Sequence, residues 1–157
     1  MNAEPLIISL RLERATLLEL HSALPQRYPA LFESAACGEP LGRYDILFAL
    51  PQGTLTLDAS GELVTDAPHA HGRTFLEALD AWWSSERTDE SNLNLPFRGG
   101  WLVYLGYELA QQIESRLRLP MPESGPIAQA IRVQAAIILR HADSQAWLVI
   151  EPGAADS

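Results

Sequence analysis

The sequence contains no lysine, and all 11 of its basic residues are arginine. Without an ammonium group on a flexible stem, the chain supplies neither a Schiff-base lysine, nor a lysine nucleophile, nor the lysine of a Walker-type phosphate loop. The single cysteine, Cys37, excludes an intramolecular disulfide and a zinc site built from several thiolates. These absences exclude several classes of enzyme and metal protein.

Long apolar runs and an excess of positive charge are also missing. No apolar stretch approaches the roughly 20 residues that cross a bilayer. Charged residues interrupt the first 25 positions, where a signal peptide has a continuous apolar core. The 20 acidic residues outnumber the 11 basic ones, and the net charge of -9 repels phosphate backbones and anionic lipid. We therefore expect a soluble, cytoplasmic protein that binds neither nucleic acid nor a membrane.

The composition fits one globular domain, because 157 residues with 47% hydrophobic side chains can bury a core of their own. Apolar and alternating runs predict strands, and capped amphipathic stretches predict short helices. Strands and helices do not alternate regularly, which favours an α+β fold on an antiparallel, sandwich-like sheet of at least six strands with about three short helices. The predicted strands are 6–12, 43–50, 54–57, 62–65, 100–107, 131–139 and 146–150, and the predicted helices begin near Thr16, Thr74 and Glu108.

Two of these segments carry detailed expectations. Thr74 and Glu77 have the spacing of a capping box, in which each side chain accepts a backbone N–H at the start of a helix. The helix should extend to about residue 85. Its predicted buried stripe is Phe75, Leu79, Trp82 and Trp83. Segment 100–107 is apolar at successive positions, which predicts a strand covered on both faces. Its flanking glycines favour a close backbone approach or a bulge over a phosphate loop.

The histidines do not indicate a catalytic or metal site. His69 and His71 lie two residues apart without an identifiable third ligand, which favours a solvated loop. His21 lies on the apolar stripe of the first predicted helix and is expected at the edge of the core, and His141 is expected in a turn. No nucleophile stands out beside a base. We therefore assign no catalytic residue and no metal ligand, and we expect no cofactor in this chain.

Two longer segments indicate more than packing. The first comprises residues 28–35 (YPALFESA) and 41–47 (LGRYDIL), and the second comprises residues 95–109 (LPFRGGWLVYLGYEL) and 113–115 (IES). Both resemble the amino-terminal domain of the chorismate-using amidotransferase synthases, which are the large components of anthranilate synthase and aminodeoxychorismate synthase. The second is similar to the PF-x-GG…GY-[DE]-L segment of that family. Asp45 after Arg43-Tyr44, and Leu-Pro before Phe97, place the chain closer to the aminodeoxychorismate (para-aminobenzoate) synthase component I.

The resemblance implies that the chemistry lies outside this chain. In that family the large component aminates chorismate with ammonia from a glutamine amidotransferase subunit. It uses Mg2+ and a carboxyl-terminal chorismate-binding domain, which in the para-aminobenzoate branch carries a proposed lysine nucleophile. None of that domain's motifs occurs here, and the chain has no lysine. We expect residues 1–151 to form the amino-terminal domain, 152–157 to be a disordered tail, and the chain alone to be inactive.

The same resemblance implies half of a tryptophan pocket. Carried over by motif, its residues are Phe32, Ser34, Leu41, Gly42, Arg43 and Tyr44. Phe32 and Tyr44 would offer apolar walls to an indole, while hydroxyl or backbone groups would bind the zwitterionic end of L-tryptophan. Arg43 has two interpretations, because it could pair with the ligand carboxylate or form an internal ion pair with Asp45.

Two other interpretations stay open. The domain could chiefly buttress the carboxyl-terminal domain and help to dock the glutamine amidotransferase subunit, leaving uncovered sheet edges through which the fragment would self-associate. Alternatively, the chain could be a freestanding β domain that binds an unrelated small molecule.

Overall fold

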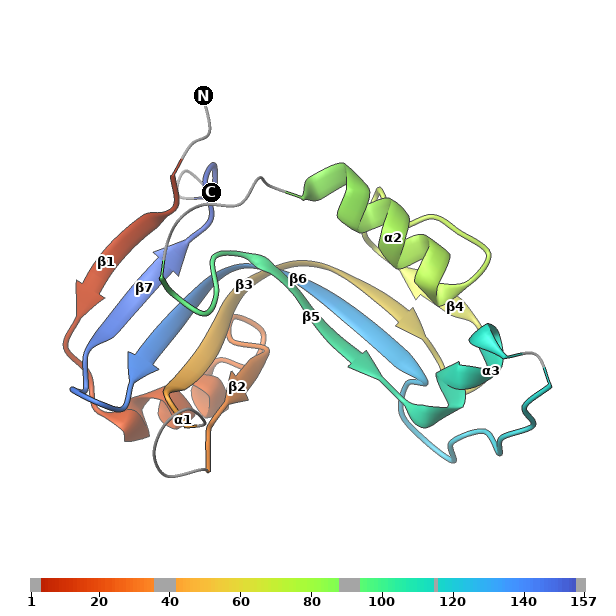
Figure 1. Ribbon diagram of the computed structural model, residues 1–157, viewed down its shortest axis with the longest axis horizontal. Helices are drawn as coiled ribbons and strands as arrows, with labels where there is room; N and C mark the ends of the chain where they lie inside the picture. The colour runs from red at the N-terminus through yellow and green to blue at the C-terminus, as the bar shows by residue number, and fades with distance from the viewer. Residues whose placement is uncertain (1–3, 36–41, 88–93, 115, 155–157) are drawn as a thin grey trace. The chain divides into compact units, whose positions relative to one another are not determined.

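The computed structural model describes residues 4–35, 42–87, 94–114 and 116–154, so residues 155–157 of the predicted tail lie outside the described residues (Figure 1). The chain divides into two compact units. Unit 1 comprises residues 1–51, 89–100 and 133–157, and unit 2 comprises residues 52–88 and 101–132. Among the described residues, seven strands and three α-helices form an α+β fold, which confirms the predicted fold class. Two long strands, β3 (Tyr44–Leu57) and β6 (Ala128–Arg140), supply residues to both units.

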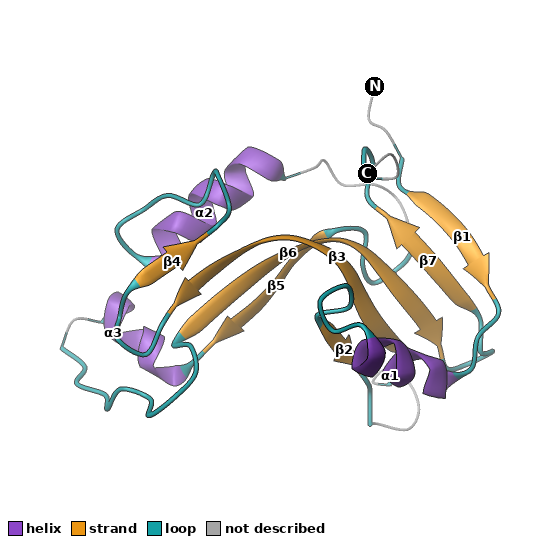
Figure 2. Ribbon diagram, turned by 180° about the vertical axis from the view of Figure 1, so that it is seen from behind, coloured by secondary structure: helices purple, strands orange, loops and turns teal. Residues whose placement is uncertain are grey.

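In unit 1, five strands are hydrogen-bonded in the order β1-β7-β6-β3-β2. The elements that belong to this unit alone are β1 (Leu6–Leu10), α1 (Arg14–Ala23), β2 (Ala30–Phe32) and β7 (Ala146–Ile150). β1 pairs antiparallel with β7, with Ser9 opposite Trp147. Helix α1, drawn in purple in Figure 2, buries Leu17 completely in an apolar cluster with Leu47 and Leu139. This cluster is the core of unit 1 on the α1 face of the sheet.

Unit 1 departs from two local predictions. Helix α1 begins at Arg14 instead of after Thr16, and Thr16 donates its backbone N–H to the carbonyl of Glu13 (3.1 Å) inside the first turn. β3 is one strand where two were predicted. Leu50 adopts a positive φ of 56° and donates its N–H to the carbonyl of Arg27, after which the strand continues through Pro51. A local bend of this kind lets a strand pass a proline without ending.

Unit 2 contains β4 (Leu63–Thr65), α2 (Phe75–Glu86), β5 (Gly100–Leu105), a 3-10 turn (Tyr107–Leu109) and α3 (Ala110–Ile113), with Gly100 itself assigned to unit 1. The predicted strands 54–57 and 62–65 form a hairpin, because β4 pairs antiparallel with the end of β3. The Asp58 carboxylate holds its turn by accepting the N–H groups of Ser60 (2.8 Å) and Glu62 (2.9 Å). The short helix predicted to begin near Glu108 is a 3-10 turn followed by one turn of α-helix.

Helix α2 confirms most of its prediction. Thr74 accepts the N–H of Glu77 (3.2 Å), while the Glu77 carboxylate accepts the N–H of Arg73 (2.8 Å), one residue before the group expected in a capping box. Phe75 and Trp82 are buried, and Leu79 packs against the same core. The prediction for Trp83 is wrong, because this ring is 45% exposed with the Arg87 guanidinium 5.0 Å from its centroid. Consecutive helical residues point about 100° apart, so burial of Trp82 turns Trp83 aside.

The strand predicted to be covered on both faces is an edge strand instead. β6 is the only strand that pairs with β5 in the described part of the chain. The end of β5 is open, since Val103, Tyr104 and Leu105 are 47%, 55% and 54% exposed. Among the described residues, no helix is long and apolar enough to cross a bilayer.

The glycines beside β5 do permit close backbone approach, as predicted. Gly99 has a φ of 111°, and a Cβ placed there would lie 2.8 Å from the carboxyl carbon of Glu151. A Cβ on Gly106 would lie 2.6 Å from the carbonyl oxygen of Ile127. These contacts, within strand and loop packing, explain the glycines without a phosphate loop.

Candidate functional site

The described half-pocket residues lie at one end of unit 1, where β2 ends and β3 begins. In the antiparallel ladder Phe32 is opposite Ile46, which brings Ser34, two residues after Phe32, beside Tyr44. Gly42 and Arg43 lead directly into Tyr44. Leu41, the remaining predicted residue, lies outside the described residues. The structure therefore brings the two halves of the first sequence segment together.

A fully buried carboxylate, Asp45, holds this end of unit 1 together. Its Oδ1 accepts the backbone N–H of Ser34 (3.0 Å) and lies 2.9 Å from Nε2 of His141. Its Oδ2 lies 2.6 Å from Nε of Arg14, an ion-pair contact without the alignment of a hydrogen bond. A buried carboxylate needs such partners to remain charged. Asp45 thus fastens α1, the residues after β2 and the turn after β6 to β3.

Both ring nitrogens of His141 and its backbone N–H contact the segment 42–45. Its backbone N–H donates to the carbonyl of Arg43 (2.9 Å), and Nδ1 lies 2.7 Å from the carbonyl oxygen of Gly42. A carbonyl only accepts, so Nδ1 carries a proton. Nε2 lies 2.9 Å from Oδ1 of the Asp45 carboxylate. Gly42 turns its carbonyl toward this ring with a φ of 81°, a conformation that glycine adopts at low cost.

Three phenylalanine rings of unit 1 form an aromatic surface. The ring of Phe32 meets Phe48 edge-on at 4.9 Å, and Phe48 meets Phe97 edge-on at 5.1 Å. Phe32 is 57% exposed, which is unusual for a phenylalanine. Because Phe97 belongs to the segment 95–109, the two sequence segments that carry the family resemblance meet at Phe48. The surface can pack against a flat apolar group.

The guanidinium of Arg140 lies 4.8 Å from the centroid of the Trp147 ring. Its Nε and Nη2 donate to the two carboxylate oxygens of Asp143 at 2.9 and 2.6 Å. This hydrogen-bonded pairing raises the pKa of Arg140, to which Tyr44 also contributes, and lowers the pKa of Asp143. The charge of Arg140 is therefore balanced within the protein.

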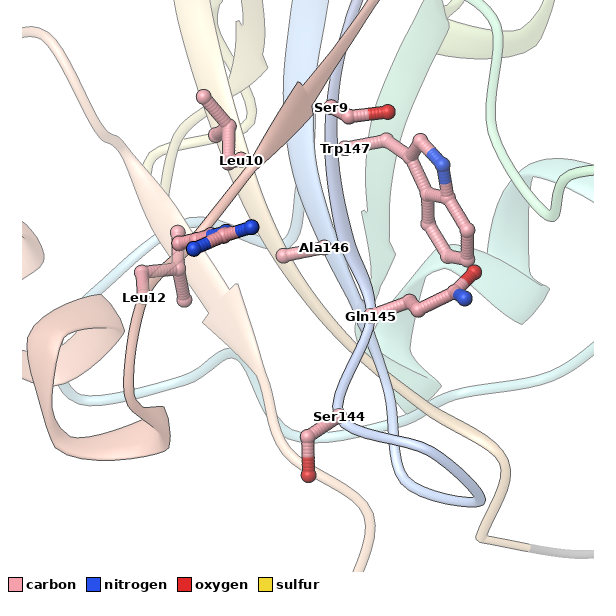
Figure 3. A pocket seen from close by; sticks show the side chains of 8 residues that line it. Ser9, Leu10, Leu12, Ser144, Gln145, Ala146 and Trp147 are labelled. Atoms are coloured by element: carbon pink, nitrogen blue, oxygen red, sulfur yellow. The ribbon is translucent and has the colours of Figure 1, made fainter.

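A separate pocket of about 450 Å³ lies along β1 and β7, and none of the predicted half-pocket residues lines it (Figure 3). It is lined by Ser9, Leu10, Arg11, Leu12, Ser144, Gln145, Ala146 and Trp147. Figure 3 shows the Trp147 ring beside the Gln145 amide at one wall of this pocket. The mixed lining offers hydrogen bonds and one aromatic ring, but it brings together no nucleophile and base.

The other histidines lie where the sequence places them. His69 and His71 are exposed loop residues, and His21 is half-buried with Nδ1 2.7 Å from the carbonyl oxygen of Tyr28. The described part of the chain contains no group of three or more histidine, cysteine or acidic side chains that could hold a metal ion.

Sequence reasoning missed Arg14 and His141 as partners of Asp45. One signal was present, because Asp45 interrupts an otherwise apolar strand, and an acid at such a position is expected to be paired. Nothing local identifies the partners, which come from α1 and from the turn between β6 and β7.

A comparison with solved structures identifies the fold. Anthranilate synthase component I from Streptococcus pneumoniae TIGR4 is similar over 94% of this chain, with a TM-score of 0.57 and 18% sequence identity. The chain spans only 32% of the length of that protein. No family model and no curated protein matches the sequence. The chain therefore has the fold of about one third of an anthranilate synthase component I.

Proposed function

We propose that this chain is the amino-terminal domain of a chorismate-utilising synthase component I, closer to aminodeoxychorismate synthase than to anthranilate synthase. The parent enzyme would aminate chorismate to 4-amino-4-deoxychorismate for para-aminobenzoate and folate biosynthesis. The supporting observation is that the likeness to anthranilate synthase component I covers 94% of this chain but only 32% of that protein. The meeting of the two family segments at Phe48 adds support.

In this proposal the domain has a structural and regulatory role, and it supplies half of a pocket for L-tryptophan. The exposed ring of Phe32 would pack against the indole, beside Tyr44. Ser34 and the backbone at Gly42 would provide polar groups for the zwitterion, and Arg43 would pair with its carboxylate. The Asp45 cluster fixes these segments relative to each other, because it bonds directly to Ser34 and, through His141, to Gly42.

The remaining parts of the synthase would lie outside these 157 residues. A carboxyl-terminal chorismate-binding domain would complete the tryptophan pocket and carry the Mg2+ and chorismate sites, and a glutamine amidotransferase subunit would supply ammonia. The chain alone would therefore be inactive. The proposal places the assembly in the cytoplasm.

Two assays test the proposal. The purified chain, incubated with chorismate, ammonium and Mg2+, should form no product. Calorimetry with tryptophan should show no tight binding until a chorismate-binding domain is added. Phe32→Ala should then weaken tryptophan binding, whereas Tyr107→Ala, at an 80% exposed aromatic residue of unit 2, should leave it unchanged. Turnover by the chain alone, or a submicromolar tryptophan constant without the second domain, would contradict the proposal.

The anthranilate branch is the second candidate, and the identity of the similar solved structure favours it. The two branches give different products, so chromatography of the reaction catalysed by the reconstituted synthase distinguishes anthranilate from aminodeoxychorismate. A freestanding small-molecule-binding domain is the third candidate, for which the pocket along β1 and β7 would be the site. Tight binding of a small molecule there, without association with a chorismate-binding domain, would favour it.

A further inference from the structure

The outer edge of β5 has no neighbouring strand in the described part of the chain. β5 comprises six residues, whereas β4, the other edge strand of unit 2, comprises three. Near the end of β5, side chains on both faces of the strand are exposed to solvent. Val103 is 47% exposed and Tyr104, on the other face, is 55% exposed. An open edge of this length is a template for pairing with another strand.

The backbone of β5 presents hydrogen-bonding groups to this open side. The N–H of Gly106 donates to the carbonyl of Ile127 (2.7 Å), on the side of β6. Backbone groups alternate in direction along an antiparallel strand, so those of Tyr104 also point toward β6. Those of Val103 and Leu105 therefore point outward.

The edge also lacks the features that usually prevent pairing. β4 is bracketed by Glu62 and Asp66, and β2 is followed by Glu33. By contrast, residues 99–107 (GGWLVYLGY) contain no charged residue and no proline. Charges and prolines are the usual protection of exposed strand edges, so β5 is the unprotected edge of unit 2.

An apolar depression of about 320 Å³ borders β5 on the side of α2. It is lined by Leu76, Leu79, Asp80, Trp83, Trp101 and Val103. Because successive side chains alternate between the faces of a sheet, a strand added beside β5 would lay every second side chain along this depression. Because the depression is mostly apolar, we expect the side chains of the added strand that lie along it to be apolar.

We propose that β5 pairs antiparallel with β5 of a second copy of this chain around a two-fold axis at Val103. This register places Val103 opposite its own copy and Trp101 opposite Leu105 of the second copy on the α2 face, with Leu102 opposite Tyr104 on the other face. Each residue from Trp101 to Leu105 then meets an apolar or aromatic partner, and no like charges face each other along the strand despite the net charge of -9. The pairing is isologous, so it closes as a dimer.

Sedimentation equilibrium over a wide range of protein concentration tests this proposal. The wild-type chain should sediment as a monomer–dimer equilibrium. Val103→Lys sets two ammonium groups opposite each other at the axis and should raise the dimer dissociation constant by about tenfold or more. The matched control is Val64→Lys, because Val64 is 53% exposed in β4, also an edge strand of unit 2. Val64→Lys should dimerise like the wild type.

A second measurement needs no variant. Amide hydrogen exchange of the wild-type chain should show increasing protection of the outward N–H groups of Val103 and Leu105 as concentration rises, with Val64 unchanged. A wild-type chain that stays monomeric overturns the proposal. So does equal weakening of the dimer by Val103→Lys and Val64→Lys, or exchange at Val103 that does not depend on concentration.

Discussion

Replacing Asp45 with asparagine should destabilise unit 1 more than any neutralisation of a surface carboxylate. The side chain is fully buried and contacts Arg14, His141 and the N–H of Ser34. An amide oxygen can still accept from Ser34, but the ion pair with Arg14 is lost and the contact with His141 is weakened. Interactions with charged groups are each worth about 1.5–3 kcal/mol. The Arg14 side chain is 52% exposed and regains water, so we expect a net loss of about 2–3 kcal/mol.

Urea and thermal unfolding followed by tryptophan fluorescence measure this loss, which corresponds to a fall in Tm of roughly 4–12 °C. Asp143→Asn is the matched control, because Asp143 pairs with Arg140 at the surface with its side chain 41% exposed. It should cost much less. A cycle that combines Asp45→Asn with Arg14→Met isolates the coupling between the two side chains. Stability of Asp45→Asn within about 0.5 kcal/mol of the wild type would refute the reasoning.

Three further predictions concern the core, acid stability and a strained glycine. Leu17→Ala, at a fully buried position of α1, should cost about 2–5 kcal/mol in urea unfolding, whereas Leu18→Ala, 52% exposed on the same helix, should cost about 0.5 kcal/mol or less. The pKa of Asp58 is lowered, first by the Ser60 hydroxyl and then by backbone N–H groups, so its stabilisation is present above about pH 4 and lost as pH falls further. Asp58→Asn should therefore lose less stability between about pH 5 and pH 3 than the wild type, and an equal loss would exclude this role. Gly99→Ala forces a side chain into a φ of 111° and should cost about 1–3 kcal/mol by thermal unfolding, and an unchanged Tm would contradict the assigned strain.

The features that the sequence predicts correctly depend on residues close together in the chain. The cap of α2 joins Thr74 to Glu77, and the hairpin turn is held by Asp58 within a few residues of its partners. The Asp45 cluster could not be predicted in the same way, because its partners lie in α1 and after β6. The apolar pattern around Asp45 indicates that this acid is buried and therefore paired. Only the tertiary structure shows which residues are its partners.

β5 shows a second reason why part of the structure could not be predicted from the sequence. Its unbroken apolar run predicted burial on both faces, yet the described residues leave Tyr104 and Leu105 open. An apolar run looks the same in the sequence whether its side chains are buried by the same chain or by another polypeptide. The sequence therefore predicts that this surface is covered, while only the fold shows that the described residues do not cover it.

In the proposed function, the amination of chorismate requires a second, chorismate-binding domain. The most direct test of this claim is ammonia-dependent turnover of chorismate with Mg2+, measured for the chain alone, for a chorismate-binding domain alone and for their mixture. We expect no turnover by the chain, and more turnover in the mixture than with the chorismate-binding domain alone. Turnover by the chain alone, or a mixture no more active than the chorismate-binding domain, would contradict the claim.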